Sequence, residues 1–182
     1  NYSNGGVSMS TLKVNTITNT SDNPDVANMG KIVQVVQNIS NSVVTTTNSS
    51  SYVNCMSSPT FSFTSGNKIL VHCNLVIGCR YGYGAKFRLL TNAGEISGAL
   101  GDASGTSREA VTKGGYISNW DIELANIVIN YLDTPSDSVN QYIVKMKSYS
   151  DQTIGLNRSY QDGNNSGSTR PISSVTLYEI AA

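Results

Sequence analysis

The chain has 182 residues, with twelve basic and twelve acidic side chains, and charged residues make up 13% of it, about half the usual share. Asn, Ser and Thr supply 62 of the 182 residues, so the polarity comes from uncharged hydrogen-bonding groups. Neither the basic nor the acidic residues are grouped in the sequence. No stretch approaches the roughly 20 apolar residues of a membrane helix. We therefore expect one soluble domain that has neither nucleic acid nor membrane insertion among its interactions.

Residues 1–30 contain few large apolar side chains, chiefly Leu12, Val14 and Ile17, and cannot bury enough area to fold alone. Residues 11–20 are rich in β-branched side chains and lack Gly and Pro, which is typical of an extended strand that needs a partner. We expect residues 1–30 to form an extended N-terminal stalk and residues 31–182 to form the head. Met9 is a candidate native start, with residues 1–8 then being a leader or linker.

From residue 31 onward, short β-type segments alternate with turn residues, which favours an all-β antiparallel sandwich of the jelly-roll type. The central segment is 67–79, in which Ile69, Val71, Cys73, Leu75 and Ile77 share one parity and are predicted to face the core. The other predicted strands are 31–37, 42–47, 52–55, 60–64, 85–91, two pieces of 116–132, 141–148, 153–156 and 173–180. No segment has the pattern of a helix.

Two of these strands carry apolar residues on both faces. In the central strand the second parity contains Leu70, His72 and Val76, and in the last strand Tyr178 and Ile180 lie opposite an apolar set. A sheet that faced water on one side would be plainly polar there. The pattern therefore indicates a contact with a neighbouring subunit.

The strand patterns also place individual side chains. Lys145 and Lys147 alternate with apolar residues in 141–148 and predict a solvent-facing side for that strand. Trp120 and Ile122 lie on one parity and residues 127–131 on the other, which requires a β-bulge or a strand break near residue 125. Trp120 is predicted to pack in the core or at an interface.

Three connections are candidate contact surfaces: 78–84, 98–115 with five glycines, and 157–171. Loops of more than about 12 residues without secondary structure are uncommon in compact domains and are usually functional or mobile. Tyr and Arg are enriched at binding sites. The residues selected on this basis are Arg80, Tyr81, Tyr83, Arg158, Tyr160, Asn164 and Asn165.

The sequence offers little catalytic chemistry. His72 and Cys73 are neighbours on a strand, so they point to opposite faces and cannot share a proton. Asp121 and Glu123 would share a strand face about 7 Å apart, and two such carboxylates usually mark a solvated surface. The three cysteines have no metal-binding spacing and are predicted to be buried free thiols, as in a chain assembled in a reducing cytoplasm. We expect no catalytic residue, no metal and no cofactor.

Several segments together resemble tail fibres and related virion proteins of marine bacteriophages, of the kind that infect cyanobacteria and other ocean bacteria. The first, STLKVNTITNT at 10–20, is similar to the repeated stalk-to-head entry of these proteins. The remaining segments are 30–37, 68–71, 130–135, 156–159 and 173–182. The resemblance spans residues 10–182 and rests on the order and spacing of the segments.

The resemblance implies a receptor-binding homotrimer with a jelly-roll head, part of a virion assembled in the host cytoplasm. It implies that the N-terminal segment attaches to other virion proteins and that the loops adhere to a host surface glycan or outer-membrane protein. The trimer interface would then contain Leu12, Val14, Ile17, Leu70, His72, Val76, Tyr178 and Ile180. Two alternatives remain: a capsid or head-fibre decoration or adaptor protein that binds only virion proteins, and a polysaccharide-degrading tailspike.

Overall fold

The computed structural model describes residues 30–103, 108–117 and 120–182. The strands in these ranges are β1 (Ile32–Ser40), β2 (Val44–Thr46), β3 (Val53–Ser57), β4 (Lys68–Cys79), β5 (Tyr83–Thr91), β6 (Gly94–Glu95), β7 (Lys113–Ile117), β8 (Ala125–Asp133), β9 (Tyr142–Ser148), β10 (Ile154–Leu156) and β11 (Ser173–Ile180). A single turn of 3₁₀ helix, η2 (Ser97–Ala99), follows β6. Over these same residues no helix has the length and apolar character needed to cross a bilayer.

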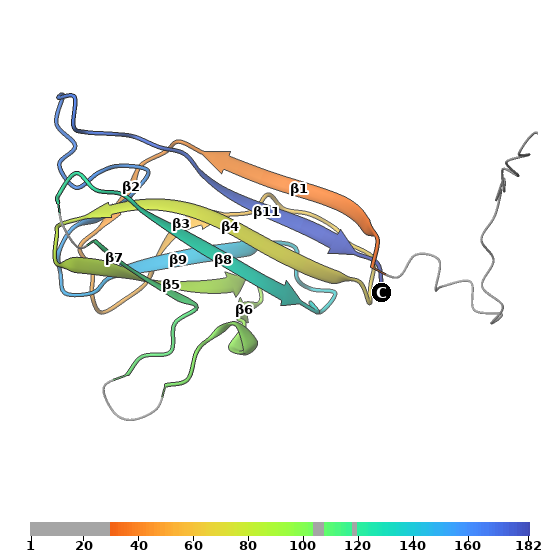
Figure 1. Ribbon diagram of the computed structural model, residues 1–182. Coiled ribbons are helices and arrows are strands. Elements are labelled where there is room, and N and C mark those ends of the chain that lie inside the picture. Colours follow the sequence, from red (N-terminus) through yellow and green to blue (C-terminus); the bar gives the residue numbers. More distant parts are fainter. Residues whose placement is uncertain (1–29, 104–107, 118–119) are drawn as a thin grey trace, which may run out of the picture.

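The strands form two antiparallel sheets packed face to face (Figure 1). One sheet has the order β1-β11-β4-β8 and the other β3-β9-β5-β7. Among these eight strands, two that follow each other in the chain always lie in opposite sheets, except β5 and β7, which are neighbours in the same sheet. This is the strand order of a jelly roll, so the predicted fold class is confirmed. Beyond the ends of β11 and β1, β10 takes the place of β11 beside β4, and β2 takes the place of β1 beside β10. β6 pairs with the end of β5.

The core lies between the sheets and is centred on β4. Its five predicted inward residues, Ile69 to Ile77 on alternate positions, are all fully buried. Phe87 and Leu89 of β5 and Val144 and Met146 of β9 meet them from the other sheet. Burial of each large apolar side chain contributes about 1.5–3 kcal/mol, which makes β4 the main source of stability in the fold.

The three cysteines are buried free thiols, as predicted. Burial raises the pKa of Cys73 to about 12 and that of Cys79 to about 11, and it raises the pKa of Cys55 as well. The thiolate is the reactive form of cysteine. At neutral pH these side chains therefore behave as small apolar core groups.

Three expectations about single segments are wrong. Residues 60–64 form no strand, because Phe61 instead packs against Tyr142 and closes the end of the core. Trp120 is not part of the core, because it lies in a turn with 69% of its surface exposed; the predicted phase change before β8 is confirmed as a strand break. Lys147 does not face water: only 8% of it is exposed, because distant parts of the chain cover it.

Asn157 lies in the first sheet at the point where β10 replaces β11 and β2 replaces β1. It is fully buried with a positive φ of 59°, and its amide Nδ2 donates to the carbonyls of Ser40 (2.9 Å) and Ser42 (3.0 Å). Its Oδ1 accepts from Ser173 Oγ at 2.5 Å, and its backbone N–H donates to Val76 O at 2.8 Å. A single side chain thus satisfies the backbone where β1 and β11 both leave the regular ladder.

Candidate association face and distal loops

The outer face of the β1-β11-β4-β8 sheet carries side chains in rows that run across the four strands. The register aligns Val35 with Tyr178, Tyr178 with Leu70, and Leu70 with Leu132. We call these four residues the apolar row. The next row in the same direction is Gln37, Thr176, His72 and Asn130, and the one after it is Ile39, Ser174, Asn74 and Val128.

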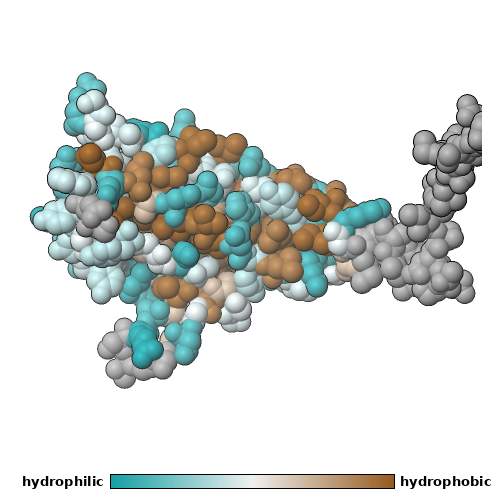
Figure 2. Space-filling view, viewed as in Figure 1, coloured by the Kyte–Doolittle hydropathy of each residue, from teal (hydrophilic) through white to brown (hydrophobic). Residues whose placement is uncertain are grey.

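The apolar row is open to solvent in the isolated chain. Val35 is 56% exposed and Leu132 50%, while Leu70 and Tyr178 between them are half-buried by their neighbours. Ile32 and Val33, at the start of β1, are also more than half exposed. Figure 2 shows apolar side chains alternating with polar ones across this face. Exposed apolar side chains gathered on one face in this way mark an interaction site.

The second row is polar, and its members hydrogen-bond in two pairs. Gln37 Nε2 donates to Thr176 Oγ1 at 2.8 Å, and His72 Nδ1 lies 2.6 Å from Asn130 Oδ1. A polar group that is paired within its own face costs less to bury than one that must lose water without replacement. Burial of this row at a subunit contact therefore costs less than burial of four unpaired polar side chains.

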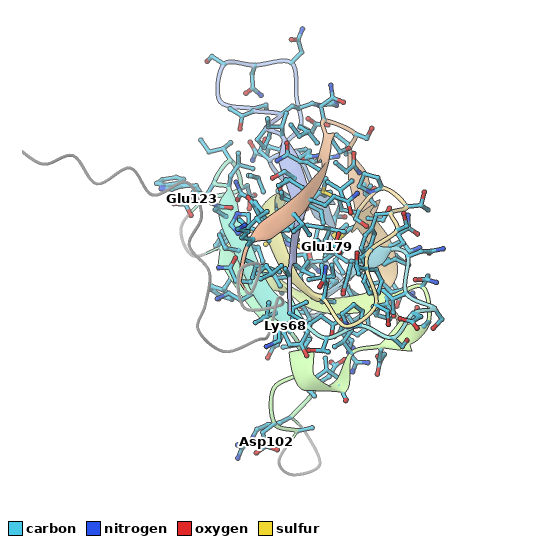
Figure 3. All side chains as sticks on the ribbon, turned by 90° about the vertical axis from the view of Figure 1, so that its right-hand side faces the viewer. Lys68, Asp102, Glu123 and Glu179 are labelled. Carbon is cyan, nitrogen blue, oxygen red and sulfur yellow. The ribbon has the colours of Figure 1, made fainter. Side chains whose placement is uncertain are left out.

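The apolar row lies near the end of the head at which the chain enters. Gly30 N donates to Ala181 O and Ala181 N donates to Lys31 O, both at 2.9 Å, so the entering chain and the C-terminus run together there. Figure 3 views the molecule from this end, at which Lys68 and Glu179 are labelled. Inside it, Glu179 Oε1 accepts from Thr64 N (2.8 Å) and Asn67 Nδ2 (2.6 Å).

All the predicted interface residues within the described ranges lie on this one face. Leu70, His72 and Val76 point outward from β4, and Tyr178 and Ile180 point outward from β11 beside them. Leu12, Val14 and Ile17 lie outside the described residues. Sequence parity did not identify Val35 and Leu132, because β1 and β8 could be placed beside β11 and β4 only once the sheet order was known.

At the opposite end of the head, three segments that are distant in the sequence meet. Asp121 Oδ1 accepts from Tyr81 N at 2.8 Å, and Asp121 O accepts from Gln161 N at 3.2 Å. The turn at 120–123 thereby joins the predicted loops 78–84 and 157–171 into one distal surface. Tyr81 (53%), Trp120 (69%) and Ile122 (43%) are its exposed large side chains.

The predicted contact residues have different surroundings in these loops. Arg80, Tyr81, Asn164 and Asn165 are exposed, whereas Tyr83, Arg158 and Tyr160 are half-buried. Arg158 donates to the carbonyls of Ser159 (2.9 Å) and Tyr160 (2.6 Å), and Asn165 Oδ1 accepts from the N–H groups of Gly167 and Ser168. Arg158 and Asn165 therefore hold the shape of the 157–171 loop.

An ion pair fixes the outer part of that loop. Arg170 donates from Nε and Nη2 to the two carboxylate oxygens of Asp162, at 2.9 and 2.6 Å. These hydrogen bonds lower the pKa of Asp162. The pairing is bidentate, a geometry that restricts the direction of both side chains.

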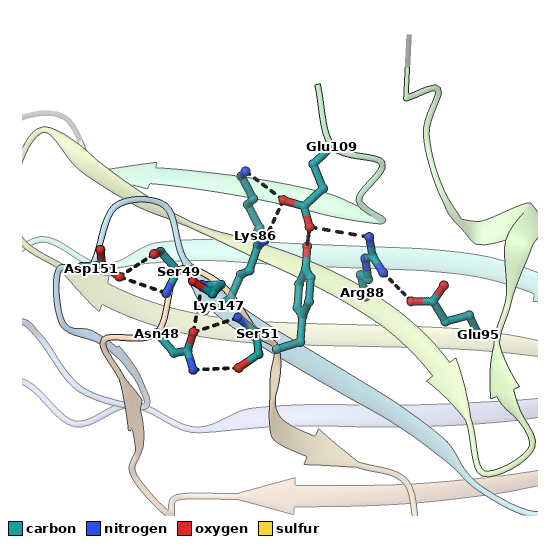
Figure 4. Close-up of polar contacts among 11 residues, drawn as sticks. Asn48, Ser49, Ser51, Lys86, Arg88, Glu95, Glu109, Lys147 and Asp151 are labelled. Carbon is teal, nitrogen blue, oxygen red and sulfur yellow. Dashed lines mark hydrogen bonds and ion pairs between the residues drawn. The ribbon is translucent and has the colours of Figure 1, made fainter. Parts of the chain in front are cut away.

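The third predicted loop, 98–115, is attached to the outer face of the other sheet through Glu109 (Figure 4). The Glu109 carboxylate accepts from Lys147 Nζ at 2.8 Å, from Lys86 Nζ at 2.9 Å and from the Tyr52 hydroxyl at 2.9 Å. The ring of Tyr52 also lies 4.9 Å from Lys147 Nζ and 4.8 Å from Arg88 Cζ. One carboxylate and one ring thus cover the buried ammonium group of Lys147.

The surroundings of Glu109 favour its charged form. Partial burial alone would raise the pKa of the carboxyl group, but the hydrogen bonds from Lys147, Lys86 and Tyr52 outweigh it and lower the pKa to about 2. Burial and the hydrogen bond to Glu109 both raise the pKa of Tyr52. Glu109 is therefore charged and Tyr52 keeps its proton across the whole neutral range.

Replacing Glu109 by Gln is expected to lower the free energy of unfolding at pH 7 by about 1–2 kcal/mol, because Lys147 loses its counter-charge. The depressed pKa of Glu109 means that its contribution is complete above the ordinary carboxyl pKa of about 4.5 and is lost as the pH falls towards 2. Urea unfolding of both proteins from pH 7 to pH 2.5 should show the difference shrinking below pH 4.5.

Glu95→Gln is the matched control, since Glu95 pairs with Arg88 but is 49% exposed. It should change the free energy of unfolding by less than about 0.5 kcal/mol. Equal effects of the two substitutions, or a Glu109→Gln effect that does not depend on pH, would show that Glu109 does not anchor the loop.

No protein-family model matches the chain, and no curated protein matches it. Among solved structures it is similar to a chain of infectious bursal disease virus, Gx strain, at 12% identity and a TM-score of 0.38, over 82% of this chain and 37% of the viral one. The Gt strain gives 11% identity and a TM-score of 0.37 over the same shares. This chain spans a little over a third of the length of those viral chains. At these values the likeness carries no functional conclusion.

Proposed function

We propose that the chain is a structural protein of a bacteriophage virion, of the tail-fibre type, and that its head adheres to the host surface as a homotrimer. The observation that carries the proposal is the apolar row. Its four residues come from four different strands and are aligned by the sheet register, yet the isolated chain leaves them in water. In the proposed trimer, three copies packed around a common axis would cover the row of each subunit.

The position of the row supports an axial arrangement. The row lies at the end where residue 30 enters, so three heads joined there would bring their N-terminal segments together. In that arrangement the three distal surfaces, with Tyr81 and Trp120, point away from the attachment end. Weak binding by each head would be multiplied through the effective concentration of the other two.

The proposed activity is binding without catalysis. Asp121 and Glu123 lie in a turn and not on a strand, so the geometry that would have paired their carboxylates on one face is absent. Asp121 is also engaged by the backbone of Tyr81. These observations weigh against the tailspike alternative and favour an adhesive role.

Host adsorption tests the proposal in the assembled virion. A deletion of residues 162–169 removes the outer part of the 157–171 loop while keeping Arg158 and the Asn157 corner. We expect particles that assemble normally and adsorb to the host at least tenfold less. A control is the substitution Ala93→Ser at the exposed β5–β6 turn near the attachment end, which should leave adsorption unchanged. If the deletion blocks virion assembly and adsorption per assembled particle is normal, the decoration or adaptor alternative is correct.

A further inference from the structure

The outer face of the β3-β9-β5-β7 sheet carries a groove of about 570 Å³ near its distal end. Glycines form much of its lining, with Gly82 and Gly84 on one side and Gly114 and Gly115 on the other. Ala85, Lys86 and Val111 complete the lining together with two tyrosines, Tyr116 and Tyr149. A volume in this range accommodates one or two sugar-sized groups.

The two tyrosines stand on opposite sides of Gly84. Tyr116 of β7 is registered directly against Gly84, and Tyr149 N donates to Gly84 O at 3.0 Å from the other side. Their backbones are therefore two strand spacings apart, about 10 Å. Tyr116 is 60% exposed and Tyr149 63%, so both rings stand clear of the core.

Glycine at position 84 is a requirement of the backbone, because a Cβ there would lie 2.2 Å from Gly115 O. The close approach of β5 and β7 leaves a flat floor between the rings. Gly114 differs: a Cβ built there meets nothing within 4 Å and would project into the groove. The groove is thus open because position 114 lacks a side chain.

Lys86 supplies the polar group. Its Nζ lies 5.4 Å from the centroid of the Tyr149 ring and 2.9 Å from Glu109 Oε2. Because its charge is matched by Glu109, the groove offers hydrogen-bond donors and phenol hydroxyls without an unpaired charge. This combination of ring faces, phenol hydroxyls and a charge-balanced ammonium group selects a ligand that is apolar on its faces and hydroxylated at its edges.

We propose that this groove binds a neutral hexopyranose unit of a surface polysaccharide. The axial C–H groups of a pyranose would pack on the rings of Tyr116 and Tyr149, which present large rigid amphipathic surfaces. Its equatorial hydroxyls would accept from Lys86 Nζ and exchange hydrogen bonds with the phenol groups. The proposed ligand adds a chemical class to the host adhesion proposed above. It rests on that proposal for the source of the sugar.

The test measures sugar binding by the full-length purified protein, by saturation-transfer NMR with a panel of neutral α- and β-linked hexose oligosaccharides at millimolar concentration. We expect binding of at least one oligosaccharide, and at least a tenfold loss of affinity in Tyr116→Ala and in Gly114→Val. Val is well suited to a strand and fills the groove from a position with open space, so this variant should fold as well as the native chain.

Ile172→Ala is the control, because it removes an exposed apolar side chain that lies outside the predicted contact loops and leaves the groove intact. It should retain full sugar binding. The proposal is overturned if no member of the panel binds, or if binding survives both Gly114→Val and Tyr116→Ala. Host adsorption and subunit mass do not enter this measurement, so its failure is distinguishable from failure of the adhesion proposal.

Discussion

Asn157→Ala is expected to destabilise the chain by about 3–4 kcal/mol, the largest single-residue effect anticipated outside the core. Two physical causes combine. Ala at a φ of 59° adopts a left-handed conformation that costs about 1–2 kcal/mol, and the carbonyls of Ser40 and Ser42 lose the amide that serves them both. Ser173 Oγ also loses its acceptor. Urea unfolding at one fixed protein concentration measures the change.

Asn157→Gly separates the two causes. Glycine adopts the positive φ without strain but supplies no amide, so the Gly variant should be more stable than the Ala variant by about 1–2 kcal/mol. The remaining deficit relative to the native chain then reports the hydrogen bonds. If the free energy of unfolding of the Ala variant is within 1 kcal/mol of that of the native chain, Asn157 does not stabilise the region where β1 and β11 leave the regular ladder.

Leu70→Lys is expected to change the assembly state and not the fold. Leu70 lies in the middle of the apolar row, on the central strand β4, and an ammonium group there would be buried without a partner when two faces meet. The mass in solution should fall threefold, towards that of a single 19.4 kDa chain. Light scattering gives the mass, and far-ultraviolet circular dichroism checks that the strands are intact.

Leu90→Lys is the matched control for this change. Leu90 is also a half-buried leucine that points outward from a central strand, but it belongs to β5 in the other sheet. It should leave the mass unchanged. If Leu70→Lys keeps the native mass, or if both substitutions reduce it equally, the outer face of the β1-β11-β4-β8 sheet is not the association surface.

The sequence predicted those parts of the fold in which local alternation dominates. In β4 five residues of one parity are fully buried, and in β11 burial alternates at every position except Thr176, which faces outward but is buried, so period and burial largely agree. Residues 60–64 failed because the β-type pattern there reflects the packing of Phe61 on Tyr142, a contact between positions 81 residues apart. Strand propensity carries no information about such contacts.

The surfaces depend on tertiary structure still more strongly. Leu70 and Tyr178 could be selected from their own strands, but their alignment with Val35 and Leu132 requires the sheet order. Tyr116 and Tyr149 form a groove only because Gly84 lies between them in the register, and Lys147 is buried only because Tyr52 and Glu109 reach it from elsewhere. In each case the relevant neighbours are distant in sequence and follow no short pattern.

The central claim is that one subunit is incomplete, and the mass of the intact chain in solution tests it most directly. Light scattering at micromolar concentration should give three times 19.4 kDa, about 58 kDa, with little dependence on salt because the apolar row is uncharged. A mass of 19.4 kDa that persists as the concentration is raised a hundredfold would contradict the account.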